Sequence, residues 1–168
     1  MELSKIEELF ATYSHTGNTI FHDLAEYGAL RLLQRIRDRI DPPFHAIQRK
    51  NYSDDFCVHS VVKWHGGLRA IDLLEVLVQM GADLNARGGR SGDTALHMTT
   101  YDGDCDLALW LCRQPQIDVH VRNHAGLTAY ELAVKKKNER LMAILCSSSV
   151  KCETPEISKH EESDTEGA

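Results

Sequence analysis

The sequence has no long hydrophobic run, no excess of positive charge and no recognisable targeting segment. No apolar stretch approaches the roughly 18 residues of a membrane-spanning helix. The start is amphipathic and mixed in charge, unlike a secretory signal. We therefore expect neither a membrane segment nor secretion. The formal net charge of −6 over 168 residues also argues against direct nucleic-acid binding, because phosphates require a basic surface.

Paired cysteines and catalytic motifs are missing as well. The five cysteines are odd in number and include no CxxC pair, so we expect reduced thiols in the cytoplasm or nucleus and no disulfide framework. The chain contains no G-x-S-x-G, no HExxH and no Gly-rich phosphate loop. Since no activated nucleophile or acid–base pair is visible, we expect no enzyme, no cofactor and no small-molecule substrate.

What the sequence does contain is an internal repeat. The stretch at 94–97, Thr-Ala-Leu-His, has counterparts at 19–22, 56–59 and 128–131, and the fourth residues of these stretches follow one another at offsets of 37, 38 and 34. About ten residues after each start, Leu and Ile recur at spacings of three and four, which is typical of an amphipathic helix. Each unit is therefore predicted to contain a loop, a short helix, a turn and a longer helix.

The period and the T-x-x-H start resemble the ankyrin repeat, whose pattern is roughly G-x-T-P-L-H-x-A-A followed by G-A-D-V-N-A. GDTALH at 92–97 and GADLNA at 81–86 match it best. The resemblance covers 17–147 and implies an all-α solenoid of about four helix-turn-helix units with hairpin loops, at about 17–50, 51–91, 92–125 and 126–147. No unit has the Pro, the second lacks the Thr, and the fourth has Glu131 for His and Lys137 for Gly.

The two ends of the chain are predicted to differ from the repeats. Residues 1–16 offer one short helix, whose Ile6, Leu9 and Phe10 would cap the open edge of the first unit. Residues 148–168 are rich in Ser, Glu and Thr and poor in core residues, which predicts a disordered acidic tail.

The polar residues that recur at the start of the units are predicted to be structural. Thr94 lies where a helix needs a cap, and its hydroxyl can satisfy an orphan amide. The resemblance implies that the motif His bonds to the Thr and to backbone of the neighbouring loop. It gives this role to Thr19, His22, His59, Thr94, His97 and Thr128. Histidines at the repeat period fit architecture better than metal binding, and His120 and His124 lack a Cys or acidic partner at ligand spacing, so we expect no metal site.

The resemblance also indicates where a partner protein would bind. Ankyrin partners generally meet the hairpin tips and the face of the inner helices, and Arg and Tyr are the expected anchors. For the lysines at 135–137, a solvated helix end, which cations favour, is preferred over a nuclear-import patch or a patch for an acidic partner. The candidate partner-binding residues are Arg87, Arg90, Met98, Tyr101, Asp102, Arg122, Asn123, Lys135 and Lys136.

A narrower resemblance concerns the first unit, GNTIFHDLAEYG at 17–28, and the pair GDTALH and GLTAYELA. These are similar to the IκB-like viral ankyrin proteins carried by polydnaviruses of parasitoid wasps. The resemblance implies a protein-binding inhibitor of host Rel/NF-κB transcription factors that suppresses immune signalling in the host cell. The chain lacks Asp-Ser-Gly, the start of the serine motif through which cellular inhibitors are degraded, which predicts constitutive inhibition. The alternative is an ankyrin adaptor or a regulatory subunit that binds another signalling protein.

Overall fold

The computed structural model describes residues 15–39 and 45–149. These residues form eight α-helices and a short 3-10 helix, with no β-strand among them beyond one isolated bridge between Gly88 and Asp93. The helices are α2 (Ile20–Glu26), α3 (Leu30–Arg39), α4 (Cys57–Trp64), α5 (Gly67–Gln79), α6 (Ala95–Asp102), α7 (Cys105–Cys112), α8 (Ala129–Lys136) and α9 (Glu139–Ser149), and the 3-10 helix is η1 (His45–Gln48).

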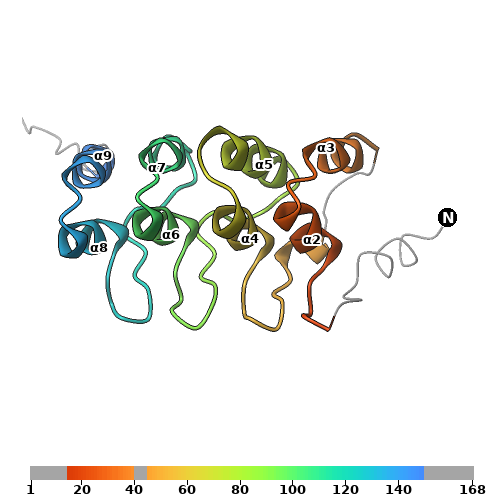
Figure 1. Cartoon of the computed structure of the whole chain (residues 1–168), viewed down its shortest axis with the longest axis horizontal. Helices are drawn as coiled ribbons and strands as arrows, with labels where there is room; N and C mark the ends of the chain where they lie inside the picture. Colours follow the sequence, from red (N-terminus) through yellow and green to blue (C-terminus); the bar gives the residue numbers. More distant parts are fainter. Residues whose placement is uncertain (1–14, 40–44, 150–168) are drawn as a thin grey trace, which may run out of the picture.

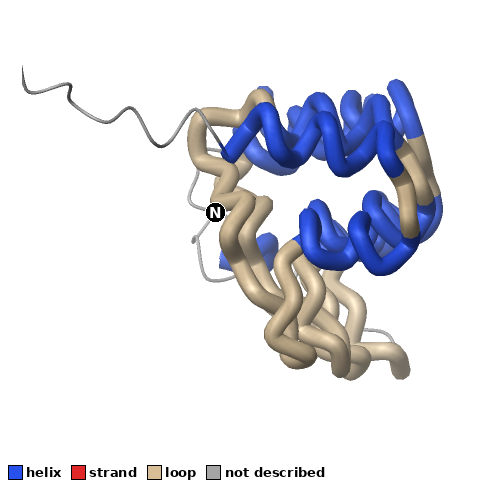
Figure 2. Tube along the Cα trace, turned by 90° about the vertical axis from the view of Figure 1, so that its left-hand side faces the viewer, coloured by secondary structure: helices blue, strands red, loops and turns tan. Residues whose placement is uncertain are grey.

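The helices lie in two layers. Figure 1 shows the inner helices α2, α4, α6 and α8 in one row, the outer helices α3, α5, α7 and α9 in a row above them, and hairpin loops below. Within each row, every helix contacts the next one. Seen along the stack in Figure 2, the loops extend away from both helical layers. The predicted all-α solenoid of helix-turn-helix units with hairpin loops is confirmed.

The predicted ends of the repeat region can be followed only in part. Helix α9 ends at Ser149, two residues beyond the predicted boundary at 147. The predicted N-terminal cap falls almost entirely on 1–14 and the predicted tail on 150–168, and both ranges lie outside the described residues. None of the described helices is long and apolar enough to cross a membrane.

A threonine and a histidine start the inner helix of the third unit. His97 Nδ1 lies 3.3 Å from the Thr94 amide and 2.9 Å from its hydroxyl, and His97 Nε2 lies 2.9 Å from the backbone oxygen of Leu127. A carbonyl can only accept, so Nε2 carries the proton and Nδ1 accepts. Thr19 and His22 form the same pair at the start of α2, at 2.9 Å. The His97 ring therefore caps its own helix and bonds to the backbone of the next unit.

The first two units use their histidines in the same way. His22 Nε2 donates to the backbone oxygen of Asp55 at 2.9 Å, and His59 Nε2 to that of Asp93 at 3.0 Å. In the second unit Phe56 replaces the threonine, and the hydroxyl contact is absent. His59 Nδ1 still accepts from the Phe56 backbone amide at 3.2 Å. Burial lowers the pKa of both His22 and His59, which keeps the rings neutral, as this arrangement requires.

The fourth unit replaces the histidine with a carboxylate. The Thr128 amide donates to Glu131 Oε2 at 2.9 Å, and the Glu131 amide donates to the Thr128 hydroxyl at 3.2 Å, which is a capping box. Arg122 Nη1 lies 2.9 Å from the same Oε2. The backbone hydrogen bond from Thr128 lowers the pKa of Glu131, and Arg122 acts in the same direction. Glu131 therefore caps its helix but has no proton to donate to a further unit.

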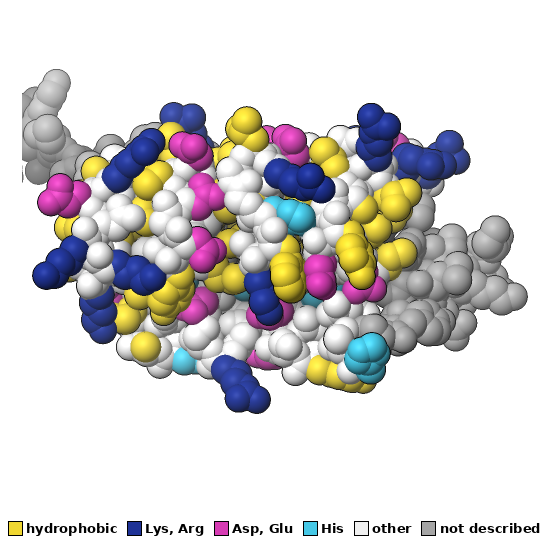
Figure 3. Space-filling view, viewed as in Figure 1, with side chains coloured by type: hydrophobic (Ala, Val, Ile, Leu, Met, Phe, Trp, Pro, Cys, Tyr) yellow, Lys and Arg dark blue, Asp and Glu magenta, His cyan; other side chains and the backbone are white. Residues whose placement is uncertain are grey.

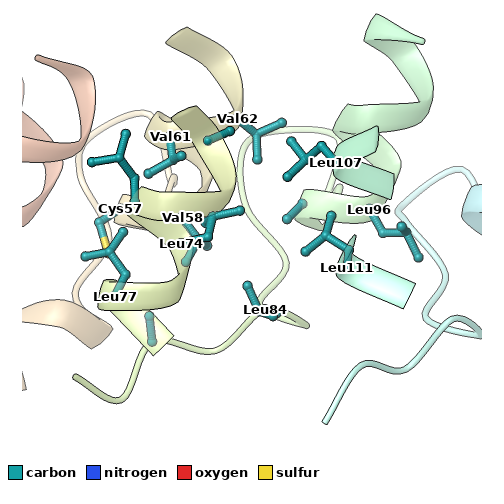
Figure 4. Close-up of a cluster of buried hydrophobic side chains, with 14 of the residues drawn as sticks. Cys57, Val58, Val61, Val62, Leu74, Leu77, Leu84, Leu96, Leu107 and Leu111 are labelled. Atoms are coloured by element: carbon teal, nitrogen blue, oxygen red, sulfur yellow. The ribbon is translucent and has the colours of Figure 1, made fainter. Parts of the chain in front are cut away.

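The core runs between the units. Figure 4 shows side chains of the second unit facing those of the third across the space between the two helix pairs. Because each unit completes its core with its neighbour, the inner helices are held at a fixed spacing. The labelled members of this cluster are Cys57, Val58, Val61, Val62, Leu74, Leu77, Leu84, Leu96, Leu107 and Leu111, all of them buried.

Candidate protein-binding face

The ends of the first three inner helices carry exposed aromatic side chains. Tyr27 follows α2, Trp64 ends α4 and Tyr101 lies in the last turn of α6. Their exposed fractions are 77%, 55% and 43%. Large rings at this exposure are typical anchors of protein interfaces. We call these three residues the aromatic row, and Figure 3 shows hydrophobic side chains, in yellow, across the inner helices on this face.

The register of the repeat accounts for two members of the aromatic row, whereas Tyr101 lies four residues after its motif histidine. Tyr27 and Trp64 each lie five residues after the motif histidine of their unit. The same step in the third and fourth units reaches Asp102 and Lys136, which the sequence had indicated as binding residues. Sequence reasoning missed Tyr27 and Trp64, and the shared register is the signal that would have found them.

A hollow of about 300 Å³ lies between α4 and α6 beside the row. It brings together three of the predicted binding residues, Met98, Tyr101 and Asp102. The lining holds three aspartate carboxylates and only one ammonium, that of Lys63, so the hollow is acidic. Met98 forms an apolar wall. Such a site suits a basic side chain with an apolar stem. Its lining residues are Asp55, Lys63, Gly88, Gly89, Ser91, Asp93, Met98, Tyr101 and Asp102.

A second hollow, of about 270 Å³, adjoins the first. Trp64 and His65 line it from the end of α4, and Asp104 and Leu107 line it from the third unit. Lys63 and Asp102 line both hollows, so they form a shared wall. The face therefore offers an aromatic ring with a depression beside it, which is the shape that receives a protruding partner side chain.

The fourth unit is joined to this face through Lys136. Its ammonium lies 4.9 Å from the centroid of the Tyr101 ring and donates to the Tyr101 backbone oxygen at 2.9 Å. Partial burial raises the pKa of the Tyr101 hydroxyl, and the Asp93 carboxylate acts in the same direction, so this hydroxyl stays a donor at neutral pH. Lys135 is exposed on the same helix, without a hydrogen bond or ion pair to any other described residue.

The hairpin between the second and third units exposes two of the predicted arginines. Arg87 and Arg90 are both exposed, and the Gly88 amide closes the hairpin by donating to the Asp93 backbone oxygen at 2.9 Å. A Cβ at Gly88 would approach the His59 ring to 2.6 Å, so only glycine fits there. The two arginine side chains therefore belong to a hairpin that is closed at Gly88 and Asp93 and packed there on the His59 ring.

Two predicted binding residues form contacts within the chain. Asn123 is 5% exposed, its amide donates to Asp93 Oδ1 at 2.8 Å, and its Oδ1 accepts from the Ala125 and Leu127 amides. The polar atoms of Asn123 therefore shape its own loop, and its contact with a partner stays a prediction. Arg122 is exposed, but its guanidinium is engaged by Glu131 at 2.9 Å.

His124 is held between two of the loops. His124 Nδ1 donates to the backbone oxygen of Arg90 at 3.0 Å, and a Cβ at Gly92 would approach its ring to 2.6 Å. Across the ranges 15–39 and 45–149, no group of three or more His, Cys, Asp or Glu is placed to hold a metal ion.

Comparison with known proteins agrees with this architecture. A family model described as ankyrin repeats (many copies) matches residues 59–112, which include the second unit's helices and most of the third. This match covers the helices that carry Trp64, Met98, Tyr101 and Asp102.

Three relatives from Microplitis demolitor bracovirus (isolate Webb) match over most of their length. I-Kappa-B like protein C2 is 31% identical over 143 residues, covering 84% of this chain and 78% of the relative. I-Kappa-B like protein H1 is 31% identical over 145 residues, covering 86% and 75%. I-Kappa-B like protein N3 is 33% identical over 132 residues, covering 78% and 81%.

Proposed function

The chain belongs to the IκB-like family of ankyrin-repeat proteins, and on this premise we propose that it binds host Rel/NF-κB transcription factors and inhibits them. At the coarser level it is a protein-binding ankyrin protein. In this proposal the chain acts by occupying a partner's surface and not by catalysis. It suppresses immune signalling in the cytoplasm of the host cell, and in its nucleus if the complex enters there.

The observation that carries the proposal is the aromatic row with its flanking hollows. One exposed ring per unit over three units gives a row of side chains of the kind that anchors protein interfaces. The acidic hollow beside Tyr101 and the ammonium of Lys136 add charges of both signs, which fix the register of a partner.

The test is recovery of partners from insect cells. The tagged chain should retain a Rel protein, identified by mass spectrometry, and should lower a Rel-driven reporter. The double variant Tyr27→Ala/Trp64→Ala should recover at least about tenfold less Rel, because interface anchors contribute about 2 kcal/mol or more each. Tyr130→Ala is the matched control, because Tyr130 is 37% exposed but lies in the first turn of α8, outside the row.

Two results would contradict the proposal. One is that the chain retains a different signalling protein and no Rel protein. The other is that the double variant and Tyr130→Ala recover equal amounts of Rel while both melt like the unaltered chain.

We further propose that this inhibition is constitutive. The 168 residues contain no Asp-Ser-Gly, so the serine motif that marks cellular inhibitors for degradation has no counterpart in them. After bacterial challenge of insect cells, the level of the tagged chain should stay unchanged while the cell's own inhibitor is lost. Stimulus-dependent loss of the tagged chain would refute constitutive action without bearing on Rel binding.

A further inference from the structure

The outer helix of the first unit carries a concentration of arginine that the proposed function leaves unused. Helix α3 reads LRLLQRIRDR, with four arginines and one aspartate, in a chain whose net charge is −6. Arg37 pairs with Asp38 at 2.8 Å. Arg31, Arg35 and Arg39 are exposed and form no hydrogen bond or ion pair with another described residue. We call these three the arginine stripe.

The stability of α3 does not explain the stripe. A spacing of four residues puts Arg31, Arg35 and Arg39 on one face of the helix, where like charges destabilise it. Arg31 also lies in the first turn, where the helix macrodipole disfavours a cation. Only Arg39, in the last turn, is favoured by the dipole.

A hollow of about 550 Å³ lies at the start of the stripe, between the first turns of α3 and α5. Leucines give it an apolar floor, and Leu32 beside it is 49% exposed. Figure 3 shows dark-blue basic side chains gathered over α3. The residues that matter for its chemistry are Leu30, Leu32, Leu73, Arg31, Arg69 and Asp72.

We propose that the hollow and the arginine stripe together dock an acidic amphipathic helix of a partner protein. An apolar side chain of that helix enters the hollow, and carboxylates repeated every four residues pair with Arg31, Arg35 and Arg39. Both helices rise about 1.5 Å per residue, so successive charges on each are about 6 Å apart and stay in step. Guanidinium groups match carboxylates because they bind both oxygens at once.

The observations favour a protein helix over a membrane surface or a nucleic acid. An anionic bilayer or a polynucleotide extends beyond the arginine stripe and meets the rest of a chain whose net charge is −6, whereas a short helix meets only the stripe and the hollow. Asp72 in the lining repels a phosphate that would enter the hollow, and it leaves the apolar floor to an uncharged side chain. The surface lies on the outer helices, whereas the proposed Rel-binding face lies on the inner ones, so the two proposals are independent.

Fluorescence anisotropy with the full 168-residue chain tests the proposal. The probe is a labelled 17-residue helical peptide with Glu at every fourth position and Leu on the adjoining face, compared with a peptide that has Gln for each Glu. Arg31→Gln/Arg35→Gln should weaken binding of the Glu peptide at least about tenfold, and Leu32→Ser several-fold. Arg87→Gln/Arg90→Gln removes the same charge from the hairpin and should change the affinity less than about twofold.

The results that would overturn the proposal are distinct from those that bear on Rel binding. Equal loss in the α3 and hairpin variants would show unspecific charge attraction. Binding of phosphatidylserine vesicles that depends on Arg31 and Arg35, without peptide binding, would assign the surface to membranes. The α3 double variant should still recover Rel from insect cells, and circular dichroism should confirm that it is folded.

Discussion

The inner helices of the third and fourth units start with similar caps, but only the cap residue of the third unit also bonds to the unit that follows. Thr94 and Thr128 both precede an inner helix, and each amide donates to a side chain three residues on, His97 Nδ1 at 3.3 Å or Glu131 Oε2 at 2.9 Å. His97 has a second nitrogen that reaches the backbone oxygen of Leu127 in the next unit. Glu131 has only acceptors. The cap can therefore be built from either residue, but only the histidine links one unit to the next.

The same two units also differ at the end of the inner helix. Gly103 closes α6 at a φ of 75°, and Lys137 closes α8 at a φ of 57°. Both are left-handed, a conformation that glycine adopts freely and lysine adopts at a cost. The fourth unit thus lacks the onward link of the histidine units and carries backbone strain at Lys137.

The largest expected effect comes from removing the linking histidine. His97→Ala should lower the free energy of unfolding by about 2–4 kcal/mol, because it leaves the Thr94 amide and the Leu127 carbonyl without their partners. Glu131→Ala should cost clearly less, because the exposed Glu131 carboxylate serves only as a helix cap. Chemical denaturation measures both, and equal losses would mean that the link adds nothing to the cap.

Acid should destabilise the units that are capped by histidine before the unit that is capped by Glu131. The pKa of His22 and His59 is lowered in the folded chain, so the unfolded chain binds more protons below about pH 6.5. Their stabilisation is complete above that pH and falls by about 1.4 kcal/mol per histidine for each pH unit below it, until the folded-state pKa is reached. Glu131, whose pKa is lowered from an already acidic value, keeps its charge there.

Hydrogen exchange between pH 7.5 and 5.5 can resolve this contrast residue by residue. After correction for intrinsic rates, the amides of Thr19 and Phe56, which donate to histidine, should lose protection before the amide of Thr128. Simultaneous loss at all three positions would show that acid acts on the whole stack and not through the histidines.

A smaller effect is expected at the helix ends. Lys137→Gly should raise the free energy of unfolding by about 1 kcal/mol, since it relieves a left-handed lysine, and Gly103→Ala should lower it by a similar amount. Thermal unfolding of the two variants provides the measurement. A destabilised Lys137→Gly would show that the lysine side chain contributes more than its backbone costs.

The smallest effect should follow from exchanging the two caps. Glu131→His keeps an acceptor for the Thr128 amide but gives up the exposed ion pair with Arg122, so the free energy of unfolding should change little. A loss similar to that of Glu131→Ala, again by chemical denaturation, would show that histidine cannot serve as the cap in this unit.

The repeat made most of the fold predictable. The spacing of His22, His59 and His97 indicated equivalent places in successive units, and each of these rings bonds to backbone of the unit that follows. The carboxylate at Glu131 was visible in the sequence as a departure. Glu131 preserves the helix cap but makes no bond to a following unit, because its carboxylate oxygens can only accept hydrogen bonds. This distinction became clear only from the hydrogen bonds of the structure.

The binding face was less predictable because exposure depends on neighbouring units. Met98, Tyr101 and Asp102, which were predicted from the close fit of the third unit to the ankyrin pattern, line one hollow. Asn123 follows an exposed arginine in the sequence, yet its amide turns inward to Asp93, thirty positions earlier. Such a contact between loops leaves no local signal in the sequence.

The most direct test of the central claim is the affinity of the purified chain for a purified Rel protein, measured by titration calorimetry. The unaltered chain should bind, Tyr27→Ala/Trp64→Ala should bind at least about tenfold more weakly, and Tyr130→Ala should bind within about twofold of the unaltered chain. All three should melt at similar temperatures, because the substituted side chains are exposed. No heat of binding with the unaltered, folded chain would contradict the account.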